Sequence, residues 1–253
     1  MLRLMKYEYR RNLAGIVVML SVILLAQCYY LFSVLRKEPY MAMGASMLLA
    51  FVASLSVLGM LIFSVALYSR ELGTKASYLT FMTPNTMPKI LGAKLIAALL
   101  LGAFFAAVIT LLAIWDVRLM IASFPDLEIA RELAEQFAQM MNMELSTIIA
   151  NVVAVAIGFV VNFLAIVMVA YLAITLSATA LQNRRLKGLV SFALFVGLIV
   201  LLEWGVAQYP EAYYGDTLVR GLLDDWPSYA TFLAVIAGSF ALSAWLLEKK
   251  VSL

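Results

Sequence analysis

The chain alternates between long apolar runs and short polar segments, and this pattern recurs six times along its length. A run of about 18 or more residues with few charges is long enough to cross the hydrocarbon core of a bilayer as a helix. Six runs meet this criterion, and the fourth is the longest: Leu13–Leu35, Met41–Tyr68, Leu95–Trp115, Ser146–Leu176, Gly188–Val206 and Tyr229–Leu247. The sequence therefore predicts an all-α integral membrane protein with six transmembrane helices.

Composition agrees with this prediction. Of the 253 residues, 65% are hydrophobic and 13% are charged, whereas a soluble domain averages about 45–50% apolar and about 25% charged residues. No internal repeat and no low-complexity linker divides the chain. We therefore expect residues 1–253 to form a single transmembrane domain.

The distribution of basic residues predicts how the chain is oriented in the membrane. If the N-terminus lies inside, 13 of the 18 lysines and arginines fall in the inner segments and five fall in the outer ones. Cytoplasmic loops carry the excess of basic residues in membrane proteins. We expect a multi-pass plasma-membrane protein whose two termini are both cytoplasmic.

The first apolar run contains Leu25-Ala26-Gln27-Cys28, which resembles a bacterial lipoprotein cleavage box. Gln27 is bulky and polar where such a box needs a small residue, and the run continues to Leu35. A run of about 20 residues fits a spanning helix better than the shorter core of a signal peptide, about 7–15 residues. We expect a retained first helix.

The N-terminal segment is the first of three predicted helices that do not span the membrane. Leu2–Asn12 mixes apolar residues with four cations, a composition that suits a helix lying flat at the inner headgroups. The four cations are Arg3, Lys6, Arg10 and Arg11.

The other two non-spanning helices are predicted on the outer side. Ser123-Phe-Pro-Asp126 has the form of a capping box, and the apolar residues that follow it fall on one helical face; these are Leu127, Ala130, Leu133, Ala134, Phe137 and Met141. Asp216–Trp226 reads as a short helix that ends at Pro227, before the last span.

Several kinds of chemistry are missing from the sequence. The chain has no histidine, the usual general base at neutral pH and the commonest metal ligand. It has no phosphate-binding loop for a nucleotide, and no two carboxylates share an apolar run. We therefore expect that the chain is not an enzyme, that it holds no cofactor or metal, and that it has no nucleic-acid partner.

Polar residues within the apolar runs are candidates for a translocation path. Glu203 lies near the outer end of the fifth run, beside Trp204, and is either a carboxylate at the membrane interface or part of an exit path. Asn151 and Asn162 recur on one helical face of the fourth run, either packing against another helix or lining a cavity. Apolar cargo would meet aromatic and methionine surface at Phe104, Phe105, Met168, Phe192 and Phe195.

The polar segment Ser69–Lys94, between the second and third runs, carries four basic residues and one acid. Its first half has the spacing of a short amphipathic helix that ends at Pro84, and Pro88 is expected in the first turn of the next helix. A loop that only obeys the charge rule needs no amphipathic helix. The face that the predicted amphipathic helix would present to a partner consists of Leu72, Ala76, Leu79 and Met82.

The order of features along the chain is distinctive. A basic N-terminal helix and two spans precede a stretch of the form Arg-Glu…Gly-Thr…Leu-Thr-Phe-Met-Thr-Pro; Lys-Ile-Leu-Gly-Ala-Lys-Leu then enters the third span, and three more spans and a basic tail follow. Over its whole length the chain resembles the permease subunit of ABC-2 type transporters. Larger members of that family have extended extracellular domains, which this chain lacks.

The resemblance implies a half-transporter that forms a homodimer, or pairs with a paralogous permease, and docks two cytoplasmic ATPase subunits that bind ATP and Mg. It implies that Leu2–Asn12 is an elbow helix and that Arg70–Thr83 is the coupling helix held by the ATPase. The residues concerned in and around the coupling helix are Arg70, Glu71, Leu72, Gly73, Lys75, Ala76, Leu79, Met82 and Pro84.

Compact permeases of this kind are similar to bacterial exporters of antimicrobial or cytolytic peptides, including phenol-soluble modulin exporters. We therefore expect export of an amphipathic peptide or a hydrophobic small molecule, with antibiotic resistance and then lipid or glycan export as the next alternatives. A different alternative is a membrane scaffold or sensor that binds a cytoplasmic partner and transports nothing.

Overall fold

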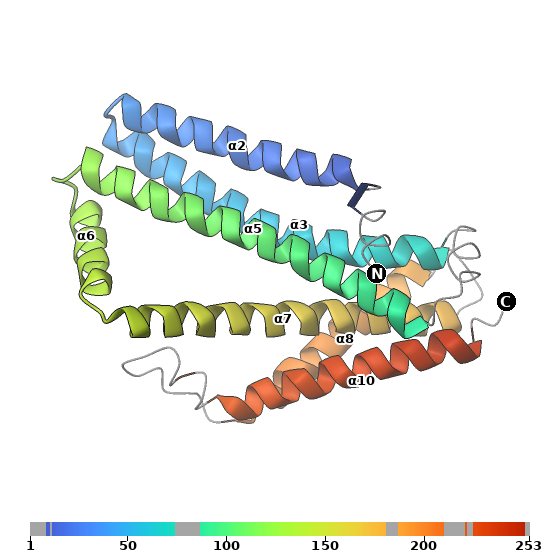
Figure 1. The fold of residues 1–253 in the computed structure, drawn as a ribbon. Coiled ribbons are helices and arrows are strands. Elements are labelled where there is room, and N and C mark those ends of the chain that lie inside the picture. Colours follow the sequence, from blue (N-terminus) through green and yellow to red (C-terminus); the bar gives the residue numbers. More distant parts are fainter. Residues whose placement is uncertain are drawn as a thin grey trace. The chain divides into compact units, whose positions relative to one another are not determined.

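A computed structural model describes residues 9–10, 12–73, 87–180, 187–209, 221 and 225–250. Within these residues the chain forms seven helices and no strand (Figure 1): α2 (Leu13–Leu35), α3 (Pro39–Gly73), α5 (Met87–Ser123), α6 (Glu128–Met141), α7 (Leu145–Ala180), α8 (Lys187–Val206) and α10 (Trp226–Lys250). All but α6 are long and apolar enough to cross a membrane. The prediction of an all-helical, multi-pass membrane protein is confirmed, whereas the sides on which its termini lie stay a prediction.

The helix bounds differ most from expectation at α5. The predicted span covered Leu95–Trp115, but α5 runs from Met87 to Ser123. The predicted span stopped at charged residues, and a charge does not end a helix as a proline does. Pro88 lies in the first turn of α5, as predicted, and Pro125 follows its end. Asp116 is therefore inside α5 and not in the loop that follows it.

The end of α3 also differs from the prediction. The predicted span ended at Tyr68, but α3 continues without a break through Gly73. Most of the predicted amphipathic helix that ends at Pro84 lies outside the described residues. No proline or glycine interrupts residues 60–72, so the chain has no local reason to leave the helix. α3 has 35 residues, about 50 Å at 1.5 Å per residue, and exceeds the roughly 30 Å of hydrocarbon.

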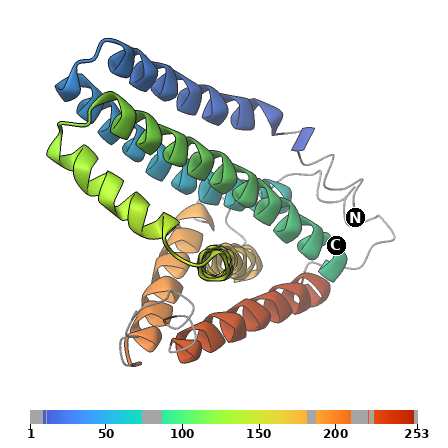
Figure 2. The same ribbon diagram turned by 60° about the vertical axis from the view of Figure 1, so that its left-hand side comes forward.

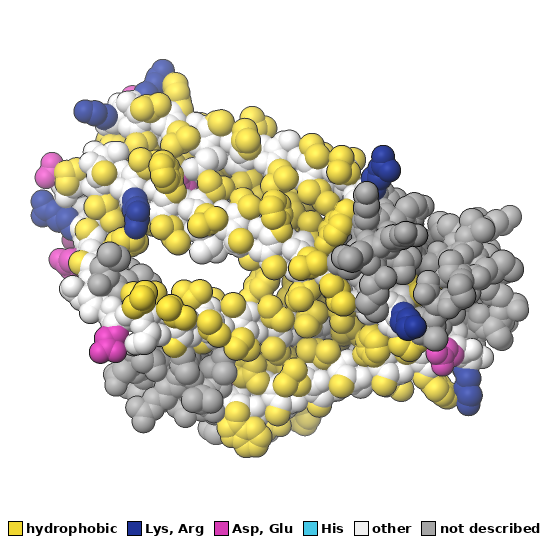
Figure 3. Space-filling model, in the orientation of Figure 1, with side chains coloured by type: hydrophobic (Ala, Val, Ile, Leu, Met, Phe, Trp, Pro, Cys, Tyr) yellow, Lys and Arg dark blue, Asp and Glu magenta, His cyan; other side chains and the backbone are white. Residues whose placement is uncertain are grey.

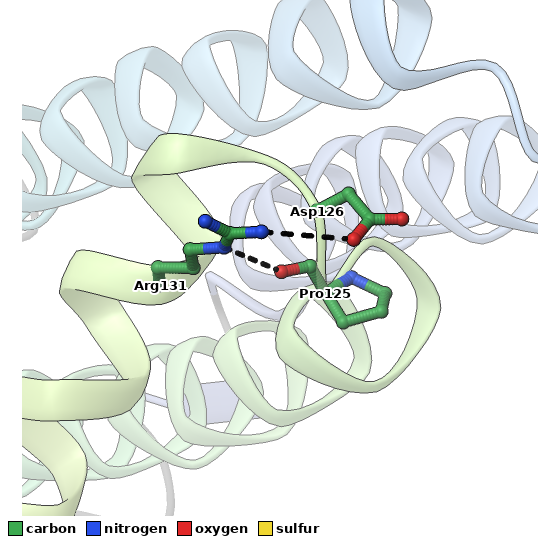
Figure 4. Close-up of polar contacts among 3 residues, drawn as sticks. All are labelled: Pro125, Asp126 and Arg131. Atoms are coloured by element: carbon green, nitrogen blue, oxygen red, sulfur yellow. Dashed lines mark hydrogen bonds and ion pairs between the residues drawn. The ribbon is translucent and has the colours of Figure 1, made fainter.

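The amphipathic helix predicted after the third span is confirmed as α6, although the predicted capping box is wrong. Ser123 is the last residue of α5, so it does not begin α6. Figure 4 shows instead that Arg131 reaches back over the turn before α6. Its Nε donates to the Pro125 carbonyl at 3.3 Å, and its guanidinium lies 3.7 Å from the Asp126 carboxylate. Both charged side chains are exposed, so the ion pair contributes little stability.

The prediction for Pro227 is also wrong, since Pro227 is the second residue of α10 and does not precede the last span as a stop. Proline is well tolerated in the first turn of a helix, where its missing N–H would have no intrahelical acceptor. Most of the predicted helix Asp216–Trp226 lies outside the described residues.

The chain divides into two compact units. Unit 2 comprises residues 6–60 and 100–148, and unit 1 comprises residues 61–99 and 149–253 together with the first five residues. Both α3 and α5 run from one unit into the other. In unit 2, α2, the first part of α3 and the last part of α5 lie side by side in both views (Figures 1 and 2).

The apolar core of unit 2 lies near the turn between α2 and α3. Its buried members come from three helices and the residue after α5: Tyr30, Val34, Ala42, Ala45, Met120 and Phe124. Leu127 and Leu133 pack against this cluster, which holds the start of α6 over the helix ends. In the turn itself, Lys37 adopts a positive φ of 54° and its N–H donates to the Val34 carbonyl, which ends α2 in the left-handed conformation common at helix C-termini.

Large apolar side chains cover the outside of the helices. Leu25 is 67% exposed, and α8 has a single buried residue, Leu202, along its 20 residues. Figure 3 shows hydrophobic side chains over the visible faces of α2 and the last part of α5, with charged side chains gathered at the end of unit 2 where α6 lies. Apolar surface of this extent suits contact with lipid and not with water.

Packing in unit 2 predicts the effect of enlarging Ala45. This side chain is fully buried in the unit 2 cluster, so Ala45→Leu forces its neighbours apart and lowers the free energy of unfolding by about 1–3 kcal/mol. Unfolding of the purified chain in detergent measures the change. The matched control is Ala113→Leu, at an exposed position of α5 in the same unit, which should leave stability almost unchanged; equal effects of the two substitutions would contradict the packing.

Candidate functional site

Most residues of the predicted elbow and coupling helices lie at the edge of the described chain or outside it. Arg10 is exposed, whereas Arg3, Lys6 and Arg11 lie outside the described residues. The backbone of residues 70–73 forms the last turn of α3. The coupling residues Lys75, Ala76, Leu79, Met82 and Pro84 lie outside the described residues.

The predicted path residues lie on two helices, Asn151 and Asn162 on α7 and Glu203 on α8. Asn162 is exposed on α7, and its amide donates to the Gly158 carbonyl of the same helix at 2.9 Å. Glu203 is exposed on α8, while Asn151 is half-buried on α7. Gly158 lets the Tyr229 side chain of α10 pack closely, because a Cβ at this position would lie 3.1 Å from the Tyr229 hydroxyl. The amide of Asn162 is thus satisfied within its own helix, and whether Asn151 and Asn162 line a path stays a prediction.

Only some of the residues that were predicted to form an apolar cargo surface are exposed. Phe104 and Phe192 are 50% and 68% exposed, but Phe105 and Met168 are fully buried. Phe195 is half-buried. Sequence alone could not separate these positions, because apolar residues occur all round a spanning helix and mark no single face.

A polar lock joins α3 to α7 in unit 1. It consists of Ser64 and Tyr68 on α3 and Tyr171 and Thr175 on α7. The two tyrosine rings are stacked, with centroids 4.2 Å apart and planes inclined by 16°. The Tyr171 hydroxyl donates to the Ser64 carbonyl at 3.2 Å, and the Tyr68 and Thr175 hydroxyls lie 2.5 Å apart. All four residues are buried.

Hydrogen bonding in the polar lock has a defined direction. The single hydrogen of the Thr175 hydroxyl is donated to the Tyr171 carbonyl at 2.8 Å, so the Tyr68 hydroxyl must donate to Thr175. Each helix therefore donates one hydrogen bond to the other. Both bonds join residues 107 positions apart in sequence, and this constant offset means that α3 and α7 run parallel here.

A second polar contact, in unit 2, was not predicted. The Gln27 amide of α2 donates to the Asp116 carboxylate of α5 at 2.5 Å, and the Tyr30 hydroxyl donates to the Asp116 backbone carbonyl at 2.8 Å. In the sequence, Gln27 stands out only within the apparent cleavage box, and Asp116 follows the predicted third span, Leu95–Trp115. A polar residue inside each of two apolar helices was the signal that could have found the pair.

Comparison of the chain with models of protein families, with curated proteins and with solved structures found no match.

The polar lock predicts the cost of removing its hydroxyls. Tyr68→Phe and Tyr171→Phe each delete one buried hydrogen bond between helices and should lower the free energy of unfolding by about 0.5–1.5 kcal/mol. The matched control is Tyr209→Phe, which removes an exposed hydroxyl bonded to Thr231 and should change stability little. If both buried substitutions behave like the control, the two bonds do not hold α3 to α7.

Proposed function

We propose that this chain is the membrane subunit of an ATP-driven exporter of the ABC-2 type, in which a separate cytoplasmic ATPase supplies the energy. The ATPase binds the segment between α3 and α5, and its closure on ATP is passed through these helices to the rest of the membrane domain. Two copies of the chain, both with cytoplasmic termini, form the transporter.

The polar lock carries this proposal. A segment that receives force from a partner needs a stiff connection to the spans, and α3 leads directly into residues 74–86. Tyr68 lies five residues before the end of α3 and is bonded and stacked to α7. Displacement of the end of α3 is therefore transmitted to α7 and not absorbed between loosely packed helices.

Cargo of low charge fits the lipid-facing surface. Phe104 and Phe192 are exposed aromatic residues on two different spans, and the exposed side chains of the spans are largely apolar. An amphipathic peptide or a hydrophobic antibiotic can partition into the bilayer beside such surfaces, which favours peptide export, with antibiotic resistance as the next alternative. Lipid or glycan export ranks behind these two.

The proposed coupling face predicts how ATPase binding responds to a new charge. Leu79 lies on that face, so Leu79→Asp places a carboxylate in the interface and should weaken binding of the ATPase by at least about 10-fold. The measurement is co-purification with an ATPase encoded beside this chain, followed by titration of the pair. The matched control is Ser77→Asp, which adds the same charge off the face and should leave binding nearly unchanged.

Two outcomes would contradict the proposal at different levels. If the Leu79→Asp chain still binds the ATPase and hydrolysis stays coupled to transport, the coupling helix is misplaced. If vesicles containing the wild-type chain and ATPase hydrolyse ATP at a rate that no cargo changes, and move no peptide or drug, a scaffold or sensor replaces the exporter.

A further inference from the structure

Oxygen-bearing side chains from α2 and α5 converge within unit 2, about one turn in from the apolar cluster. Gln27 and Tyr30 are three residues apart and lie on one face of α2. Both donate hydrogen bonds to Asp116, Gln27 to the carboxylate and Tyr30 to the backbone carbonyl. Tyr30 also belongs to the unit 2 cluster. Two polar side chains of α2 thus meet α5 at one residue, Gln27 at its carboxylate and Tyr30 at its backbone carbonyl.

The charge of Asp116 is not balanced within the part of the chain that the structure describes. Its carboxylate has Gln27 as its only hydrogen-bonding partner there and makes no ion pair. Two arginines of unit 2 are directed at aromatic rings instead. The Arg118 guanidinium lies 5.4 Å from the Phe137 ring centre, and that of Arg36 lies 4.6 Å from the Phe32 ring centre. A half-buried carboxylate in an otherwise apolar helix, without a counter-charge among the described residues, is a candidate functional group.

An unpaired oxygen lies beside this carboxylate. Gln27 is only 9% exposed, and its Oε1 is buried without a hydrogen-bonding partner among the described residues. Oε1 and Nε2 share one amide, and a half-turn about the last bond of the side chain exchanges their positions. The exchange would break the hydrogen bond to Asp116, leave the amide nitrogen without a partner and set Oε1 against the carboxylate oxygen. It is therefore favourable only when a positive charge lies between the two oxygens.

We propose that Gln27, Tyr30 and Asp116 form a binding site for a small monovalent cation of the Na⁺ class. The cation would be coordinated by the Asp116 carboxylate, by the Gln27 Oε1 after rotation of the amide, and by the Tyr30 hydroxyl oxygen. The Tyr30 hydroxyl proton would still be donated to the Asp116 backbone carbonyl. Oxygen ligands suit hard cations, and one carboxylate matches one positive charge. Groups of three or more acidic, cysteine or histidine residues, which a divalent ion would favour, do not occur among the described residues.

This proposal goes beyond ATP-driven export, because ion binding at this site needs neither cargo nor ATPase. The unit 2 cluster beside the site also favours cation binding. Its member Met120 is one turn beyond Asp116 on α5 and is 5% exposed. Apolar walls lower the local dielectric and increase the attraction between a cation and a carboxylate. The cation would also link α2 to α5, so its binding should stabilise the folded chain.

The test is the melting temperature of the full-length purified chain in detergent as Na⁺ replaces choline at constant ionic strength and pH. The wild-type chain should show a Tm that rises with Na⁺ and then saturates. Asp116→Asn should abolish the rise. The matched control is Asp126→Asn, which removes a carboxylate that is 99% exposed in the same unit and should keep the wild-type response.

A second variant covers the case in which Asp116→Asn does not fold. Gln27→Leu keeps the carboxylate and similar volume, and should weaken Na⁺ binding by about 10-fold or more, since loss of even an outer partner of a metal ligand costs about 10–100-fold. Direct binding of radioactive Na⁺ to wild-type and Gln27→Leu chains measures this. The proposal is overturned if the wild-type Tm ignores Na⁺, or if Asp116→Asn responds as the wild type does.

A response to pH alone would also overturn it, because the site would then hold a proton and not a cation. Among the described residues, the titratable group in contact with Asp116 is Tyr30 of α2, while Arg36 and Arg118 are turned towards aromatic rings. The Na⁺ titration is therefore repeated at two pH values. A Tm rise with Na⁺ at both values supports the cation site, and a rise with acid that Na⁺ does not change rejects it.

Discussion

Hydrocarbon offers no hydrogen-bonding partner, so every polar group inside the spans must find one within the protein. The least costly solution is local. Ser33 and Ser56 donate to the carbonyls four residues earlier in their own helices, and Asn162 does the same. Such bonds satisfy the side chain without specifying any neighbour. Side chains that reach another helix do specify one, and these contacts decide which helices lie together.

The two cross-helix contacts differ in how completely they are satisfied. In the polar lock, the hydroxyl hydrogens of Tyr68, Tyr171 and Thr175 all have acceptors, and the rings add a stacked contact. A complete buried network makes a stiff joint. Around Asp116 the network is incomplete within the described part of the chain, because the Gln27 amide oxygen has no hydrogen-bonding partner there and the carboxylate makes no ion pair. The first arrangement suits transmission of movement, and the second suits binding of a ligand.

This difference separates the two proposals. The proposed export would depend on force that enters through the end of α3, close to Tyr68. The proposed ion binding would depend on α2 and α5 alone. Both proposals rest on the same property of the spans. Placing a polar group in lipid costs free energy, so polar groups retained there mark functional positions.

Length and hydrophobicity in the sequence determined the six spans, and helical periodicity determined the apolar face of α6, because these are local properties of consecutive residues. The ends of the helices were harder: charged residues such as Asp116 looked like boundaries, yet a charge interrupts the hydrophobicity of a run without breaking its backbone. The pairing of Tyr68 with Tyr171, and of Gln27 with Asp116, was decided only by the tertiary structure. A spanning helix is apolar on all sides, so its sequence does not show which side meets a neighbour, and residues about 90 to 110 positions apart come together only when the helices pack.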